Sequence, residues 1–292
     1  MSLRPSRKSL WVAGTVVLLV YVGTMILESR KPALPAVRAA GTHPPGYVFV
    51  SMVVDLVEAQ LEASGGWTPN DLPLTPGYWL DNLPSFQLGV MSVVRGVSVS
   101  LRDDLGRGKP SDQAHPELAQ AVEAYAADLR RWANPSAESM LQRGNDALIR
   151  FRRELGARAQ VYPRPDALLR MVEALAAELD AIDRRLLKSS DRDAVPWYKV
   201  DDNLYYAQGT AYAAQGVLRA ARADFPALRQ GRAAAALDAA VKALTESEFE
   251  PWIVTNGSKS SLLANHSANL RTILEEARLA LLDLARALRP GG

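Results

Sequence analysis

Cysteine is absent from this chain of 292 residues. That absence excludes disulfide bonds, thiolate nucleophiles, thiolate zinc sites and iron–sulfur clusters. Histidine is nearly as scarce, since the sequence holds only His43, His115 and His266, far apart from one another. The serine-hydrolase elbow, the zinc-protease helix motif and a complete phosphate-binding loop are also missing. We therefore expect no metal site, no cofactor and no reaction that these motifs would identify.

An excess of one charge is also missing from most of the chain. The sequence has 34 Lys+Arg and 32 Asp+Glu, a net charge of +2. Five basic residues and one acidic residue fall within positions 1–31, which leaves 29 basic and 31 acidic residues, a net −2, for the remainder. Because a nearly neutral domain offers no basic surface to phosphates, we expect no nucleic-acid partner.

The most prominent feature that is present is an apolar run from Leu10 to Leu27, which contains no charged side chain. As a helix it would extend about 27 Å, close to the hydrocarbon thickness of a bilayer. More basic residues precede the run than follow it, so the positive-inside rule predicts a cytoplasmic N-terminus. The alternative is a cleaved signal peptide, whose apolar region is usually about 7–15 residues long and ends at a small-residue site. The greater length and the weak cleavage sites favour an uncleaved anchor.

These features predict four regions: a cytoplasmic N-terminus (1–9), a transmembrane anchor (10–29), a proline-rich linker (30–46) and a domain outside the cytoplasm (47–292). Residues 32–46 hold four prolines and two glycines, which predicts a semi-extended spacer that lifts the domain from the membrane. A coil docked on the domain is the alternative, and both interpretations stay open.

After the linker, apolar residues recur at helical spacing and strand-like alternation is nearly absent. The pattern predicts an all-α bundle of about eight helices in one domain, with a split near residue 190 as the alternative. The stripe of small residues from Leu204 to Ala221 predicts a helix at the centre of the bundle. The predicted helices cover residues 47–64, 84–105, 118–132, 136–160, 168–186, 204–221, 237–244 and 260–288.

Three islands of aromatic and polar residues, each in or beside a loop, are the candidate binding regions. Rings that stack and carboxylates or carboxamides that orient a ligand are typical of polar pockets. The candidates are Trp79, Asp81 and Asn82 in the first island, Trp197, Asp201, Asp202, Asn203 and Tyr205 in the second, and Asn256, Asn265 and His266 in the third.

If the islands met in one cleft, Asp201 or Asp202 would be the acid/base candidate and His266 its polar partner, with Trp79 and Trp197 as stacking platforms. A structural interpretation is favoured, because each residue type also has an ordinary role there. Asp81 and Asp201 are placed to cap helices, and His266 lies in step with the apolar face of the last helix. We therefore predict no catalytic residue.

The same islands carry a family resemblance. The stretches GGWTPNDLPLTPGYWLDNLPSFQLGV, PWYKVDDNLYYAQGTAYA and TNGSKSSLLANHSANL resemble those of the bacterial domain-of-unknown-function family 2333. The resemblance covers most of the chain after about Gly41, and it implies an inner-membrane protein of Gram-negative bacteria with a periplasmic helical domain. It implies no activity, ligand or catalytic residue.

The sequence thus predicts a single-pass inner-membrane protein with a cytoplasmic N-terminus and a periplasmic C-terminal domain. Its expected function is that of a non-enzymatic scaffold for an envelope protein whose identity the sequence does not indicate. The alternative is a periplasmic hydrolase or ligand-binding domain with a cleft formed by the three islands. Gly14 and Gly23 are nine residues apart, so the apolar run has no GxxxG dimerisation signal, and no oligomeric state is predicted.

Overall fold

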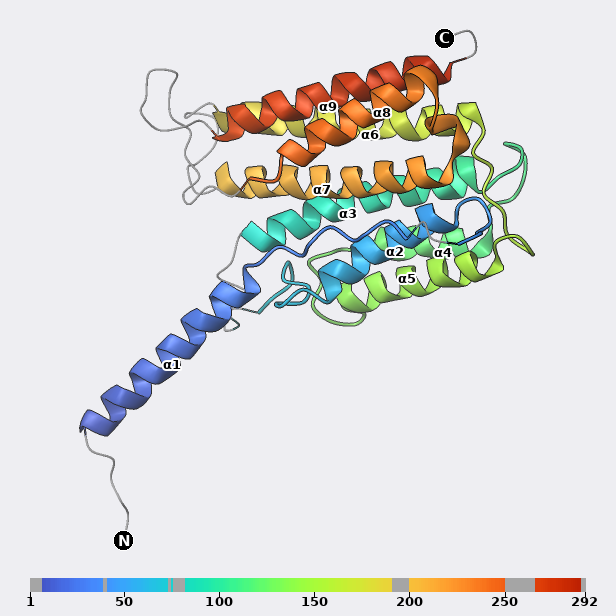
Figure 1. Ribbon diagram of the computed structural model, residues 1–292. Coiled ribbons are helices and arrows are strands. Elements are labelled where there is room, and N and C mark those ends of the chain that lie inside the picture. Colours follow the sequence, from blue (N-terminus) through green and yellow to red (C-terminus); the bar gives the residue numbers. More distant parts are fainter. Residues whose placement is uncertain are drawn as a thin grey trace.

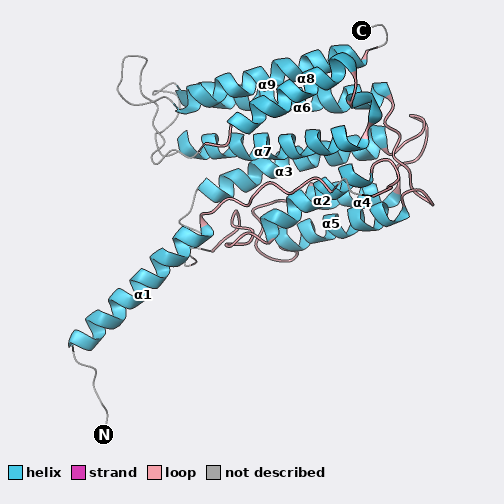
Figure 2. Ribbon diagram, in the orientation of Figure 1, coloured by secondary structure: helices cyan, strands magenta, loops and turns pink. Residues whose placement is uncertain are grey.

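The computed structural model describes residues 7–38, 41–72, 75, 82–190, 200–249 and 266–289, and within these residues the regular structure is helical (Figure 2). A π-helical turn, Leu101–Leu105, continues α3, and a short 3₁₀-helix, Pro226–Leu228, follows α7. The prediction of an all-α fold is confirmed. The nine α-helices of this part of the chain are α1 (Arg7–Glu28), α2 (Tyr47–Leu61), α3 (Asn82–Ser100), α4 (Pro116–Tyr125), α5 (Ala137–Glu154), α6 (Pro165–Ser190), α7 (Val200–Asp224), α8 (Gly231–Glu246) and α9 (His266–Leu288).

Helix α1 extends away from the other helices (Figure 1). Its window Trp11–Glu28 is long and apolar enough to cross a membrane, and no part of that window is fully buried. A membrane anchor and a signal sequence both meet this description. The last turns of α1 touch the bundle, since the Tyr21 hydroxyl donates a hydrogen bond to the carbonyl oxygen of Thr75, 3.3 Å away.

The remaining helices form three layers (Figure 1). Helices α6, α8 and α9 lie on one side, α3 and α7 form the middle, and α2, α4 and α5 lie on the other side. Helix α7 is buried along most of its length, as its stripe of small residues predicted. Helices α3 and α7 run parallel and approach each other at two glycines. A Cβ atom at Gly89 would lie 2.0 Å from the carbonyl oxygen of Tyr206, and one at Gly209 would lie 2.0 Å from that of Phe86.

Helix α2 is buried on nearly all sides. One of its polar side chains, Ser51, accepts a hydrogen bond at Oγ from the Arg152 guanidinium over 3.0 Å. The N-terminus of α2 is capped from α7, because the backbone N–H of Phe49 donates to Asp224 Oδ2 over 2.9 Å. Helix α2 therefore joins the C-terminal end of α7 to the layer formed with α4 and α5.

Two predicted helix ends were wrong. The helix predicted over 118–132 ends at Tyr125, and Trp132 lies in the following loop with 67% of its side chain exposed. Arg95 explains this end, because its guanidinium donates to the carbonyls of Tyr125 and Ala127, each over 2.6 Å. A continuing helix would need these carbonyls for its own hydrogen bonds. The helix predicted over 136–160 ends at Glu154, and Gly156 adopts a left-handed φ of 83° in the turn that follows.

The ends of the helices gather at two opposite ends of the bundle. Ser85 near the start of α3 donates to Asp202 at the start of α7 over 2.9 Å. Helices α6 and α9 run antiparallel, since Arg271 pairs with Asp183 and Arg289 pairs with Glu173. The starts of α3, α7 and α9 and the end of α6 therefore share one end, where α1 joins (Figure 1). We call it the α1 end, and the opposite one the distal end.

Candidate functional site

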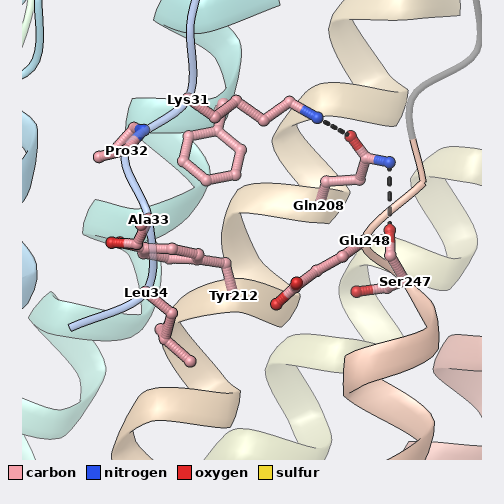
Figure 3. A pocket seen from close by; sticks show the side chains of 9 residues that line it. Lys31, Pro32, Ala33, Leu34, Gln208, Tyr212, Ser247 and Glu248 are labelled. Carbon is pink, nitrogen blue, oxygen red and sulfur yellow. Dashed lines mark hydrogen bonds between the residues drawn. The ribbon is translucent and has the colours of Figure 1, made fainter. Parts of the chain in front are cut away.

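A cavity of about 280 Å³ lies between the segment after α1 and helices α3 and α7, close to the end of α8 (Figure 3). We call it the linker cavity. Residues 31–34 form one wall of it, so part of the predicted spacer is a component of the site. The other walls are formed by Phe86, Gln208, Tyr212, Ser247 and Glu248.

Lys31 is the central contact of the linker cavity. Its ammonium group donates a hydrogen bond to Gln208 Oε1 over 2.8 Å. The same group lies 4.7 Å from the centre of the Tyr205 ring and 5.8 Å from that of Phe86. Both distances are within the range at which the face of an aromatic ring attracts a cation. Lys31 therefore binds α7 through Gln208 and the Tyr205 ring, and α3 through the Phe86 ring.

Gln208 connects that contact to the end of α8. Its side-chain nitrogen donates to the carbonyl oxygen of Ser247 over 3.1 Å and to that of Phe249 over 2.6 Å. Figure 3 shows the chain of bonds from Lys31 through Gln208 to Ser247. Because Gln208 is buried, the loss of its amide would leave these carbonyls without their donor.

Two further bonds fix the segment after Lys31. The Tyr212 hydroxyl donates to the carbonyl oxygen of Ala33 over 3.0 Å. Arg38 pairs with Asp55 over 3.2 Å, and only 5% of the Asp55 side chain is exposed. Burial raises the pKa of Asp55, and the positive charges of Arg38 and Arg152 oppose this rise. Of the two interpretations of the linker, these contacts correspond to a coil docked on the domain.

The described residues of the three islands all lie at the α1 end. Asn82 begins α3, and His266 begins α9 with its ring centre 6.2 Å from that of Phe249. Asp202 accepts the hydrogen bond from Ser85, while Asn203 Oδ1 accepts one from the guanidinium of Arg185. Tyr205 lies a few residues further along α7, and its buried ring contacts the ammonium group of Lys31.

Asp201 was expected as an N-cap and instead lies in the first turn of α7, where its Oδ1 accepts from the backbone N–H of Asp202 over 3.1 Å. A carboxylate in a first turn is stabilised by the positive end of the helix dipole. The other candidates, Trp79, Asp81, Trp197, Asn256 and Asn265, lie outside the described residues. The geometry thus unites parts of all three islands at one end, and it gives Asp202 and Asn203 partners on neighbouring helices.

Sequence reasoning missed Lys31, Gln208 and Tyr212, which make the hydrogen bonds of the linker cavity. Gln208 and Tyr212 stood within the second family stretch, on a helix otherwise rich in alanine and glycine. Large polar side chains on the buried face of such a helix are a usable signal, because each must find a hydrogen-bond partner. Lys31 carried no such signal, since basic residues next to an apolar run usually face the membrane surface.

A second cavity of about 530 Å³ lies where the loop after α2 meets α5. Five carboxylates line it: Glu58, Glu62, Asp71, Glu138 and Asp146. Burial, with the negative charges of Glu28 and Glu138, raises the pKa of Asp71 to about 6. Burial and the neighbouring Asp55 and Glu62 likewise raise the pKa of Glu58. This acidic cavity therefore holds carboxyl groups that accept protons more readily than usual.

Comparisons with known proteins give one extended match. The profile of a family described as an uncharacterized protein conserved in bacteria, DUF2333, matches residues 5–195 and 189–291. A transposase for insertion sequence element IS406 of Burkholderia multivorans is 41% identical over 70 residues, which are 23% of this chain and 18% of the transposase. The match thus spans less than a fifth of that protein. No solved structure matches the chain.

Proposed function

This chain belongs to the DUF2333 family of uncharacterised bacterial proteins, and we propose that it acts as a membrane-anchored scaffold that presents a helical domain to an envelope partner. In this proposal α1 crosses the inner membrane once, with the N-terminus in the cytoplasm and the bundle in the periplasm. Its apolar length and the basic residues before it support that topology.

The observation that carries the proposal is the docking of the segment after α1. Lys31, Tyr212 and the Arg38–Asp55 pair attach residues 31–38 to the bundle, and the first of these contacts lies three residues after the end of α1. A domain on a free tether samples all orientations relative to the membrane, whereas a docked segment restricts them. A restricted orientation is useful to a protein that must present one face to a partner in or on the same membrane.

The roles of the islands also favour a scaffold over an acid/base site. Asp202 accepts a hydrogen bond from Ser85, and Asn203 accepts one from Arg185. Each bond joins α7 to a neighbouring helix and therefore stabilises the α1 end of the bundle. These hydrogen bonds give both residues a structural role, which favours a protein that binds an envelope partner over one that catalyses a reaction here.

The topology is tested with single cysteines, which the cysteine-free chain allows without background labelling. A cysteine at the exposed Arg232 is predicted to react with a membrane-impermeant maleimide in intact cells whose outer membrane has been permeabilised. Labelling only after the inner membrane is broken would contradict a periplasmic bundle. The mass of the purified protein distinguishes an anchor from a cleaved signal peptide.

The scaffold role is tested by photo-crosslinking from single exposed positions around the bundle in living cells. We expect adducts with one protein, confined to neighbouring positions on one face. Lys31→Ala should reduce these adducts, because it frees the domain from its fixed orientation. Lys109→Ala is the matched control, since it removes the same charge from an exposed loop at the distal end. Equal adduct yields from both variants, or adducts scattered over all faces, would contradict the proposal.

A ligand-binding domain is the second candidate, and the linker cavity is the observation that favours it. Lys31 and Glu248 provide charges of opposite sign on its walls, and Phe86 and Tyr212 provide aromatic surface (Figure 3). These groups suit a small molecule that carries both charges. Such a molecule should raise the melting temperature of the wild-type chain and leave that of Glu248→Gln unchanged. Equal rises in the two proteins would contradict a ligand site in this cavity.

A further inference from the structure

Two loops at the α1 end carry exposed apolar side chains. Trp132 follows Arg130 and Arg131 in the loop between α4 and α5, and 67% of its side chain is exposed. Leu72, in the loop after α2, is 50% exposed. Single exposed apolar residues are common on protein surfaces, so their exposure alone carries no argument. What distinguishes these two side chains is their position relative to α1.

The loop after α2 lies beside the upper part of α1. Tyr21 donates its hydroxyl to the carbonyl oxygen of Thr75, and the backbone at Gly65 lies against Glu28. Tyr21 precedes Glu28 by seven residues, so about 10 Å of helix lies between them. The headgroup layer on each side of a bilayer is about 5–8 Å deep. If the window Trp11–Glu28 spans the hydrocarbon, Glu28 and the backbone at Gly65 lie where the hydrocarbon meets the headgroups, and the loop reaches from there toward the lipid at Thr75.

The loop of Trp132 is held against the loop after α2. Asn70 donates to the carbonyl oxygen of Arg131 and to Glu138 Oε2, each over 3.0 Å. Trp67 donates its indole N–H to the carbonyl oxygen of Leu129 over 2.9 Å. The two loops therefore form one supported surface, and the level of one loop relative to α1 sets the level of the other.

The loop after α2 is itself anchored from α3. The buried Gln87 accepts hydrogen bonds from the backbone N–H and the hydroxyl of Thr68. Its amide nitrogen donates to the carbonyls of Gly66 and Gln60. Three of these four bonds fix the loop and the fourth joins the side chain to α2 at Gln60, which limits the freedom of the loop to withdraw from the bilayer.

We propose that the surface formed by Leu72, Arg130, Arg131 and Trp132 rests in the headgroup layer of the membrane that α1 spans, as a second contact of the protein with the lipid. Tryptophan is enriched at this depth because its ring is apolar and its N–H is polar. Arginine side chains keep their charge among the headgroups while their stems contact apolar groups. This inference rests on the proposed membrane anchor.

Fluorescent probes on single cysteines test it in the full chain, reconstituted in phosphatidylethanolamine/phosphatidylglycerol vesicles. The lipid nitroxide lies near the headgroup for the probes on the bundle and deep in the acyl chain for the probe on α1. Probes at Trp132→Cys and Leu72→Cys should lose emission to the nitroxide. A probe at Arg232→Cys, exposed at the distal end, should not. A probe at Val17→Cys, exposed in the middle of α1, reports insertion of the anchor by itself.

The outcomes separate the two proposals. Quenching at 17, 72 and 132 but not at 232 supports the membrane contact. Iodide in the aqueous phase quenches probes that are exposed to water. If the nitroxide quenches only the probe at 17, and iodide quenches the probes at 132 and 232 equally, the membrane contact is overturned and the anchor is retained. No quenching at 17 overturns the anchor, and the contact with it. The role of the ring is tested at position 72: Trp132→Ser should reduce quenching there and Trp132→Tyr should preserve it, whereas equal quenching in both would overturn that role.

Discussion

The close approach of α3 and α7 gives a sharp test of the fold, through the substitution Gly89→Ala. A Cβ at this position would lie 2.0 Å from the carbonyl oxygen of Tyr206 and 3.0 Å from the backbone nitrogen of Thr210. Both atoms belong to the backbone of α7, so no side chain can rotate to make room. Gly96 in the same helix is the matched control, since a Cβ there meets no atom within 4 Å.

The two substitutions should change stability in opposite directions. Ordinary contact begins at 3.4 Å, so Gly89→Ala requires the helices to separate by about 1.4 Å. Overpacking of a close-packed core costs about 1–3 kcal/mol. Alanine gains about 1 kcal/mol over glycine inside a helix, and Gly96→Ala should realise that gain. Because Gly89→Ala has the same gain, the two variants should differ in free energy of unfolding by the overpacking cost, about 1–3 kcal/mol.

The measurement is thermal unfolding of the full chain in detergent micelles, followed by helical circular dichroism. For a domain of this size, about 1 kcal/mol shifts the melting temperature by roughly 2–4 °C, so Gly89→Ala should melt roughly 2–12 °C below Gly96→Ala. The separation would also open the wall that Phe86, Gln208 and Tyr212 give to the linker cavity. Equal melting temperatures would refute the backbone contact between α3 and α7.

Three further predictions concern single side chains. Gln208→Ala should lower the free energy of unfolding by about 1–3 kcal/mol, because carbonyls at the end of α8 lose their donor. It should also speed proteolysis within residues 30–38, because Lys31 loses its hydrogen bond to Gln208. Unchanged cleavage would contradict the docked segment. Because the pKa of Asp71 is about 6 in the folded state against 3.8 for a free carboxyl, this group destabilises the protein as pH rises through that range. Asp71→Asn should therefore melt above the wild type at pH 7.5, with a gap that narrows below about pH 6 and closes near pH 3.8; a constant gap would refute it. Asp224→Ala should cost about 0.5–2 kcal/mol in chemical denaturation by uncapping Phe49, while Asp224→Asn should keep most of the cap; equal losses would contradict the cap.

Helical periodicity located the helices of the bundle, since each must bury one face. The centre was predictable too, because α7 combines small residues with apolar ones and small residues permit close approach. The end of α4 was not, since Trp132 continued the apolar spacing of that helix. Arg95 ends α4 from α3, about 30 residues earlier in the chain, by taking two of its carbonyls. A contact of this kind leaves no local pattern.

The site was predictable in part for the same reason. Aromatic and polar composition identified the islands, and their described parts do lie at one end of the bundle. The hydrogen bond from Lys31 to Gln208, however, joins residues 177 positions apart, on segments that showed no shared pattern. Periodicity predicts which face of a helix is buried, and it does not predict which distant polar group will meet that face.

The docked segment also limits which partners the proposed scaffold can reach. Residues 30–46, if fully extended, would span about 60 Å and could raise the bundle well above a membrane. With Lys31 bonded to Gln208 and Arg38 to Asp55, residues 31–38 run along the bundle instead. In the proposed topology the α1 end then stays near the membrane, and only a partner within or on that membrane can touch it. A partner in the distant envelope would have to bind the distal end, where residues 106–115 and the turn before α8 lie.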